Sequence, residues 1–236
     1  MPQAPKSQTP STPVVVLLGG PGSGKGTHGQ ALASALGYEH VSLGDHFRDH
    51  IRRGTPLGRQ AGKFIENGQL VPDAWVTELM GTLFRGCPTA KDAKGVVLDG
   101  YPRSLAQAET LEGIAAAAGC AITVALYLAV SDDETVRRLS GRLTCGSCGR
   151  TFHETSKPPA RPGVCDACGA ELLRRADDEP TTIRRRIALF HEMIGPLLGL
   201  YRGTGRLVEI AAEGTVGEVS ARVIAHWQVH GTDEPR

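Results

Sequence analysis

The sequence has few aromatic residues, no long apolar run and no excess of either charge. Aromatic residues make up 5% of the 236 residues, so any core must be built mainly from aliphatic side chains. The longest apolar run, at 121–130, is far shorter than the roughly 20 residues of a membrane-spanning helix. With 26 basic and 25 acidic residues, the net charge of +1 gives no overall polycation. We therefore expect no membrane partner and no nucleic-acid partner, and the lack of an apolar segment near the start predicts a cytoplasmic protein.

The length permits one large core domain that carries inserts. Residues 1–13 contain four prolines and several polar residues, which predicts a disordered extension. Residues 230–236 are predicted to form a polar tail.

A glycine-rich stretch near the start follows an apolar run at 14–18, which predicts a buried strand. A helical pattern at 30–36 comes after it, and Lys25 lies between the two. The glycines are Gly19, Gly20, Gly22, Gly24 and Gly26. Without a Cβ they let backbone N–H groups converge on a phosphate, to which Lys25 adds a charge. The hydroxyl expected directly after the lysine is replaced by Gly26, and Thr27 comes one place later. The alternative is a turn that only connects strand to helix, and the lysine in this context argues against it.

Strand and helix patterns alternate along the rest of the chain. Strands are expected at 14–18, 39–42, 95–100, 121–130 and 207–210, and helices at 30–36, from 45, 54–68, 71–85, 104–118, from 131, 180–202 and 216–227. This alternation predicts an α/β fold with a doubly wound parallel sheet. The helices between the second and third strands predict a helical insert.

Four of the six cysteines form two CxxC pairs separated by sixteen residues, namely Cys145, Cys148, Cys165 and Cys168. This spacing is close to that of a four-thiolate zinc ribbon, in which Zn²⁺ is structural because no coordination position is open. The alternatives are two redox dithiols or a disulfide pair, and the ligand type also permits iron. The other two cysteines, Cys87 and Cys120, are expected to be small core residues.

A zinc ribbon also occurs in nucleic-acid-binding modules, which gives a second class of function. Phe152 is the one aromatic residue of this segment, and Glu154, Asp166 and Glu171 dilute its positive charge. These residues argue against nucleic-acid binding.

Asp99 ends an apolar strand, where open α/β sheets place ligand-binding groups. A carboxylate there could hold Mg²⁺ through water, and the alternative is a helix cap or turn residue. Several arginines add a second signal: Arg48, Arg103, Arg138, Arg142, Arg175 and Arg186. Phosphoryl transfer needs planar donors around developing charge and requires no general base here.

The chain resembles the adenylate kinases of the zinc-containing bacterial type, a family of nucleoside monophosphate kinases, from Val14 to Trp227. The matching motifs are GGPGSGKGT at Gly19, SLGDHFR at Ser42, ENGQLVPD at Glu66, LDGYPRSLAQA at Leu98, SGRLTCGSC at Ser140, PGVCDACG at Pro162 and RADDEPTTIRRR at Arg175. The resemblance implies transfer of a phosphoryl group from MgATP to AMP, giving two ADP, by a monomer with a structural Zn²⁺. It also implies three parts: a P-loop core at 14–42, 72–142 and 176–229, an AMP-binding insert at 43–71, and a zinc-ribbon lid at 143–175.

The resemblance assigns roles to individual residues. For ATP it implies Gly22, Ser23, Gly24, Lys25, Gly26, Thr27, Arg138, Arg142, Phe152 and Ala212. For AMP it implies Leu43, Arg48, Val71, Gly100, Arg103, Gln107, Arg175 and Arg186. The residues expected to be catalytic are Lys25, Arg103, Arg138, Arg142, Arg175 and Arg186, while Asp177 and Asp178 would tie the lid to the arginines.

Four positions depart from the family pattern. Leu43 replaces a threonine that faces the AMP base, and the loss of its hydroxyl raises the alternative of CMP, UMP or GMP as the acceptor. Leu143 replaces an arginine and His28 replaces a glutamine, and neither change is expected to abolish the chemistry. Ala212 replaces a glycine that meets the donor adenine.

Overall fold

The computed structural model describes residues 11–85, 87 and 93–230. Most of the predicted extension and tail, residues 1–10 and 231–236, lies outside this range. The first strand begins at Thr12, because the Thr12 N–H donates to the Gly119 carbonyl at 3.0 Å. Thr12 and Pro13, which the sequence assigned to the extension, therefore belong to the sheet.

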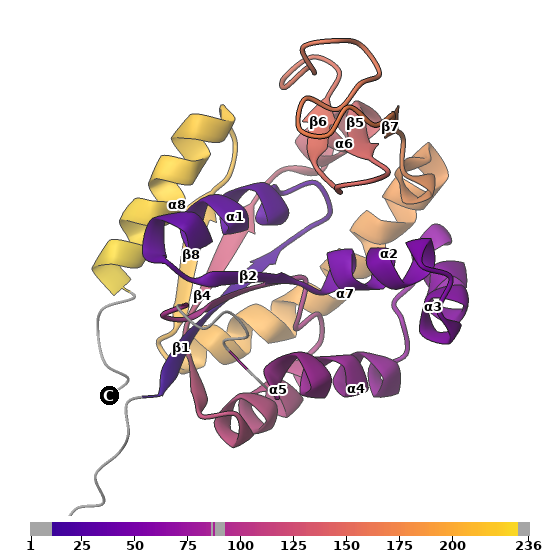
Figure 1. Ribbon diagram of the computed structural model, residues 1–236. Helices are drawn as coiled ribbons and strands as arrows, with labels where there is room; N and C mark the ends of the chain where they lie inside the picture. Colours follow the sequence, from indigo (N-terminus) through magenta and orange to yellow (C-terminus); the bar gives the residue numbers. More distant parts are fainter. Residues whose placement is uncertain (1–10, 86, 88–92, 231–236) are drawn as a thin grey trace, which may run out of the picture.

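Five parallel strands form the central sheet, in the order β2-β3-β1-β4-β8 (Figure 1). The strands are β1 (Thr12–Gly19), β2 (Glu39–Ser42), β3 (Val96–Asp99), β4 (Cys120–Ala129) and β8 (Leu207–Ala211). The run at 14–18 is buried, as a strand covered on both faces requires. The predicted doubly wound α/β fold is confirmed.

Helices cover both faces of the sheet because successive side chains of a strand point to opposite faces. Val15 and Leu17 of β1 pack in a cluster with α1 (Lys25–Leu36) and α8 (Val216–His230). Val14 and Val16 pack in a second cluster with α4 (Asp73–Phe84), α5 (Leu105–Ala117) and α7 (Pro180–Gly203). Figure 1 shows α1 and α8 on the face opposite to α5 and α7.

Two short helices, α2 (Leu43–Arg52) and α3 (Pro56–Glu66), form the insert between β2 and α4. Each begins at a hydroxyl cap: Ser42 accepts from the Asp45 N–H, and Thr55 accepts from the Gly58 N–H. Gly58 lies directly against α2, since a Cβ there would fall 2.1 Å from the His50 carbonyl oxygen. Helix α3 is shorter than the predicted 54–68 because Pro56 begins it.

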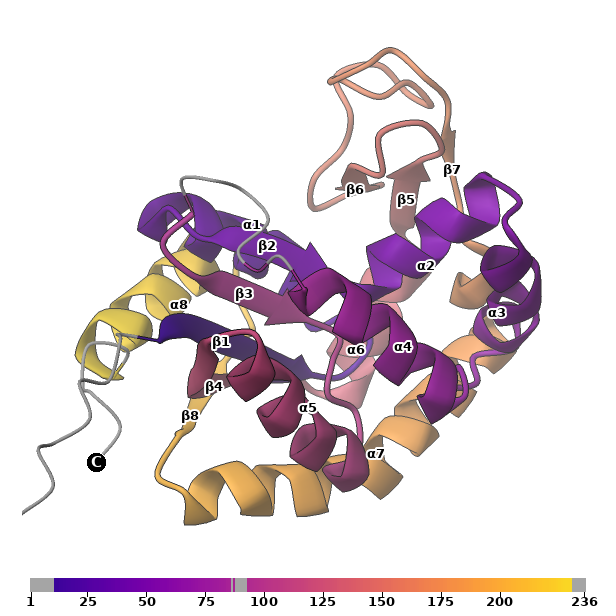
Figure 2. The ribbon, with the colours of Figure 1, turned by 60° about the horizontal axis from the view of Figure 1, so that its bottom comes forward.

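The cysteine-rich segment forms a small antiparallel sheet that projects from the core beside α2 (Figure 2). Its strands are β5 (Arg142–Cys145), β6 (Thr151–His153) and β7 (Leu172–Leu173). Helix α6 (Asp132–Ser140) leads into the segment, and the short helix η1 (Ala176–Asp178) leads out to α7. Among the described residues, no helix is long and apolar enough to cross a membrane.

Candidate functional site

The turn between β1 and α1 is shaped to receive an anion. Gly22 and Gly24 have positive φ angles of 73° and 87°, and Gly24 is the N-cap of α1. The Ser23 N–H donates to the Gly20 carbonyl at 3.2 Å, which closes the turn. The first turn of α1 carries no acidic residue, so its free N–H groups and helix dipole are available to a negative ligand.

Lys25 folds back over this turn. Its Nζ donates to the carbonyl oxygens of Gly19 at 2.7 Å and Gly20 at 2.8 Å. Burial lowers the pKa of Lys25 to about 8, Asp99 opposes this shift, and the cations Arg103 and Arg186 add to it. An anion bound beside Lys25 would stabilise its charged form and raise its pKa.

Asp99 lies beside the phosphate loop at the carboxyl end of β3. A Cβ added to Gly26 would fall 3.5 Å from its Oδ2 atom. His40 Nε2 approaches the same oxygen at 3.9 Å, and the Asp99 side chain is 11% exposed. The side chain therefore reaches the start of α1, where a hydrated cation bound to phosphates would lie.

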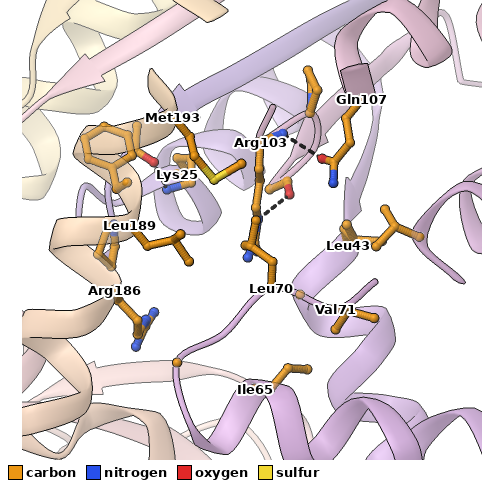
Figure 3. Close-up of a pocket in the computed structure, with 18 of the residues that line it drawn as sticks. Lys25, Leu43, Ile65, Leu70, Val71, Arg103, Gln107, Arg186, Leu189 and Met193 are labelled. Atoms are coloured by element: carbon orange, nitrogen blue, oxygen red, sulfur yellow. Dashed lines mark hydrogen bonds between the residues drawn. The ribbon is translucent and has the colours of Figure 1, made fainter. Parts of the chain in front are cut away.

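A pocket of about 1210 Å³, including its open mouth, begins at Lys25 and extends toward the insert. Figure 3 shows Lys25 and Arg186 on one side of the opening and Leu43 and Val71 on the other, with Arg103 between them. The lining joins residues from the core, the insert and α7, so the pocket exists only when these parts of the chain are assembled. Cations from the phosphate loop, the insert and α7 (Lys25, Arg48 and Arg186) share the lining with apolar side chains of the insert and of α7.

The structure gathers most of the residues predicted for the acceptor along this pocket. It is lined by Leu43, Arg48, Val71, Gly100, Arg103, Gln107 and Arg186, whereas Arg175 is outside the lining. Arg48 pairs with Asp45 at 2.5 Å, and Arg103 Nε donates to the Gly100 carbonyl at 2.9 Å.

A network of arginines and carboxylates connects the lid to α7. Arg142 binds Asp178 through two hydrogen bonds of 2.7 and 2.5 Å, and Arg186 contacts Asp177 at 2.8 Å and Asp178 at 3.2 Å. Although burial opposes it, Arg186 and Arg142 hold the pKa of Asp177 below its usual value. Of the two arginines to which the aspartates were expected to tie the lid, Arg186 pairs with both, while Arg142 takes the place expected of Arg175.

Arg175 lies beside this network, and its Nε donates to Thr144 Oγ1 at 2.9 Å; no carboxylate among the described residues accepts a hydrogen bond from it. Burial, followed by repulsion from Arg142 and Arg48, lowers the pKa of Arg175. A guanidinium stays charged in proteins, so the lowered pKa reports a destabilised cation that an anionic ligand would stabilise.

The residues predicted for the donor lie in three places. Gly22, Ser23, Gly24, Lys25, Gly26 and Thr27 form the loop and the first turn of α1. Arg138 donates to the Ala212 carbonyl at 2.9 Å, and both lie near the loop, since Arg138 also reaches the Gly22 carbonyl at 3.4 Å. Arg142 is the first residue of β5, at the base of the lid, and Phe152 belongs to the lid, where it packs with Cys145 and Cys165 and is 3% exposed.

Some of the pocket wall was not foreseen from the sequence. Leu189 and Met193 of α7 line the pocket, as Figure 3 shows, together with Phe47 and Ile65 of the insert. The apolar positions of the insert helices were visible as a helical pattern, whereas on α7 only Arg186 had been assigned to the site and its apolar neighbours had not.

The four predicted cysteines form one cluster in the lid, with all Sγ atoms within 4.8 Å of one another. Cys145 and Cys168 are 3.4 Å apart and Cys148 and Cys165 are 3.6 Å apart, so no disulfide joins them. N–H groups of Cys148 and Ser147 donate to the Cys145 sulfur and lower the pKa of Cys145 to about 6.

The two halves of the cluster have the same geometry. The Gly149 N–H donates to the Cys145 carbonyl at 3.1 Å, and the Gly169 N–H donates to the Cys165 carbonyl at 2.9 Å. Tetrahedral zinc with Zn–S bonds of about 2.3 Å spaces its sulfurs by roughly 3.8 Å, which these thiolates can match. The donor set therefore fits a structural Zn²⁺.

A phosphate loop on a doubly wound sheet, facing a pocket with arginines, defines a P-loop phosphotransferase. The family model described as adenylate kinase matches residues 17–206. The chain is 43% identical to the adenylate kinase of Acidothermus cellulolyticus over 90% of this chain and 98% of the relative. It is also 42% identical to the adenylate kinase of Salinispora tropica, over 89% of this chain and 95% of the relative. The chain belongs to the adenylate kinase family.

Proposed function

We propose that the protein transfers a phosphoryl group reversibly from MgATP to AMP, giving two molecules of ADP. The observation that carries this proposal is the position of Lys25, which belongs to the phosphate loop and also lines the arginine-containing pocket. One phosphate chain on the loop and a second phosphate in the pocket would therefore meet at Lys25. The names of the relatives support this reaction.

On the donor side, the N–H groups of 22–27 would bind the phosphates of ATP, and Lys25 would neutralise the transferring group. Mg²⁺ enters with ATP and would be held through water by Asp99, where it supplies positive charge to the phosphate oxygens. Arg138 and the Ala212 backbone would flank the donor adenosine, and Phe152 would complete this side from the lid.

On the acceptor side, the phosphate of AMP would lie against Arg48 and Arg103, close to Gly100. Leu43 and Val71 would contact the base, and Gln107 would hydrogen-bond to it. Leu43 and Val71 are both buried in the wall of the pocket, so this end suits a planar apolar ring.

The transfer step needs positive charge around the moving phosphoryl group more than it needs a base. Arg142, Arg175 and Arg186 would supply that charge when residues 143–175 close as a lid over residues 14–42, 72–142 and 176–229. Closure would exclude water, which would otherwise compete as the acceptor. The insert at 43–71 would close on AMP in the same way.

The cysteine cluster would hold Zn²⁺ and keep the lid folded, because the lid's own apolar cluster is small. We also propose that the protein acts in the cytoplasm as a monomer, in agreement with the resemblance of its motifs.

The proposal is tested by steady-state transfer from MgATP to AMP, CMP, UMP, GMP and dAMP. We expect a strong preference for AMP, and loss of transfer by at least about 10³-fold in Lys25→Met with an unchanged circular-dichroism spectrum. Preference for CMP, UMP or GMP would instead show that the loss of the threonine hydroxyl at Leu43 changes which base the pocket accepts. Absence of transfer to all five would refute the proposal.

A further inference from the structure

Gln107 is a buried amide in the wall of the pocket, and both ends of its side chain have partners from the protein. Its Oε1 accepts the backbone N–H of Arg103 at 2.8 Å, and its Nε2 donates to Asp73 Oδ1 at 2.6 Å. Figure 3 shows the Gln107 carboxamide on the side of the opening that leads to Leu43. Asp73 is the first residue of α4 and does not line the pocket.

These two partners allow one orientation of the amide. A backbone N–H can only donate, and a carboxylate can only accept. If the carboxamide turned over, its NH₂ group would face the Arg103 N–H and its oxygen would face the Asp73 carboxylate. Both hydrogen bonds would be lost and two repulsive contacts would replace them.

The locked amide leaves one N–H donor and one lone pair of the oxygen for a ligand, in a fixed order. Adenine offers a complementary pair, the ring acceptor N1 and the exocyclic amino donor. A 6-oxo purine has the reverse pair, with an N1–H donor beside the O6 acceptor. A glutamine that is free to turn over can match either base, whereas a locked one matches only one order.

We propose that Asp73 is a positioning residue for base selectivity, which fixes the Gln107 amide so that the pocket accepts a 6-amino purine and rejects a 6-oxo purine. This inference rests on the proposed function, because it takes the acceptor base to lie at Gln107. Base selectivity would then depend on the Asp73 carboxylate, which lies outside the pocket and acts through the Gln107 amide. Leu43, which has no polar atom in its side chain, adds no competing contact at this end.

The test compares kcat/KM for AMP and IMP, which differ in the pair of atoms concerned. In Asp73→Asn the new amide can donate as well as accept, so Gln107 can turn over at lower cost. We expect the ratio of kcat/KM for AMP to that for IMP to fall about tenfold in Asp73→Asn and in Asp73→Ala. A ratio within twofold of the original in both variants would overturn the proposal.

Two controls separate positioning from a structural effect. Glu78→Gln removes a charge from an exposed position of the same helix α4 and should keep the ratio. Ser104→Ala removes the hydroxyl that accepts the Gln107 backbone N–H at 3.2 Å, and should reduce stability without changing the ratio. Equal losses of selectivity in these controls would show that Asp73 acts only through the fold.

A second measurement does not depend on catalysis. In the nucleotide-free protein, the side-chain amide protons of Gln107 are assigned by their loss in Gln107→Glu. The proton donated to Asp73 should resonate downfield, and it should move upfield in Asp73→Ala. An unchanged spectrum would overturn the lock even if the variants were inactive. If the wild type transferred to neither AMP nor IMP, the proposed function would fail, and the equilibrium binding of the two nucleotides would then decide the inference alone.

Discussion

At the scale of the residue, Lys25 holds a charge that its surroundings do not fully compensate. Its Nζ is bound by two carbonyl oxygens, and burial lowers its pKa to about 8. A substantial fraction of the lysines is therefore neutral at pH 8 without nucleotide. Because a polyphosphate favours the charged form, binding of MgATP should raise this pKa and take up a measurable fraction of a proton per molecule at pH 8. Titration calorimetry in two buffers of different ionisation enthalpy measures this uptake.

The uptake should nearly vanish at pH 6.5, where Lys25 is already protonated in the free protein. The matched control is Lys25→Arg, because a guanidinium keeps its charge throughout this range. An equal uptake at pH 8 in Lys25→Arg would mean that another group titrates.

His28 differs from Lys25, because it is buried in α1 and is neutral in the folded protein. Burial, with the cations Arg138 and Arg222, lowers the pKa of His28 to about 4, and its Nδ1 lies 2.9 Å from Ser220 Oγ on α8. In the unfolded chain His28 binds a proton below about pH 6.5, whereas in the folded protein it stays neutral down to about pH 4. The contribution of neutral His28 to the free energy of unfolding is therefore complete above pH 6.5 and is lost as the pH falls toward 4. Over this window the free energy of unfolding should fall by up to about 3 kcal/mol more in the wild type than in His28→Gln. Urea unfolding at several pH values measures the difference, and parallel curves for the two proteins would refute it.

At the scale of the element, we expect the lid to depend on a bound Zn²⁺ for its folding, because it buries few apolar residues. Four residues form its buried cluster, and two of them are the cysteines Cys145 and Cys165. Removing Zn²⁺ with a chelator, or replacing Cys148 by Ser, should unfold the lid and leave the sheet intact. We expect amide hydrogen exchange in β5 to β7 to accelerate at least about 100-fold, with exchange in β1 and β4 unchanged.

Cys87→Ser serves as the control, since Cys87 lies outside the cluster and should leave both the metal content and the exchange pattern unchanged. Slow exchange in β5 to β7 after the metal is gone would show that the lid folds without it.

The elements also show what a sequence can and cannot reveal. The strand at 14–18 and the glycine turn were predictable because hydrophobic pattern and glycine spacing are local signals. The helix expected at 30–36 is only the later part of α1, which begins at Lys25 because the glycine turn passes directly into the helix. The strands β5 to β7 were not predicted, because each has only two to four residues and their pairing depends on the two cysteine turns. The predicted helix at 54–68 was too long because the Thr55 cap and Pro56 set its start.

The candidate site divides in the same way. The phosphate loop, the arginines and the cysteines could be predicted because residue type and spacing along the chain indicate their chemistry. The contact between Gln107 and Asp73 joins α5 to α4 across 34 positions and exists only in the folded protein. The pocket wall from Leu189 and Met193 likewise needs α7 to pack against the phosphate loop, where a Cβ on Gly20 would fall 3.3 Å from the Phe190 ring.

At the scale of the whole molecule, the insert and the lid contact each other directly across the site. Arg52 of α2 donates from its guanidinium to the Ser147 carbonyl of the lid at 3.1 Å. The same side chain pairs with Asp49 on its own helix, and so does its neighbour Arg53, for which the structure gives no lid contact in the described residues. The two arginines therefore differ mainly in their reach to the lid.

This difference makes Arg52→Ala a test of whether the contact between insert and lid supports substrate binding. Loss of the contact should favour the open arrangement and raise KM for both nucleotides about two- to fivefold, since one exposed hydrogen bond contributes only about 1 kcal/mol. The turnover number should not fall, because Arg52 is not among the residues that line the pocket. Arg53→Ala removes an equal charge from the same helix end and should leave KM unchanged. If both variants raise KM equally, the charge of α2 acts on the anionic substrates at a distance. If only Arg52→Ala raises KM, the insert and the lid are coupled through the contact with the Ser147 carbonyl.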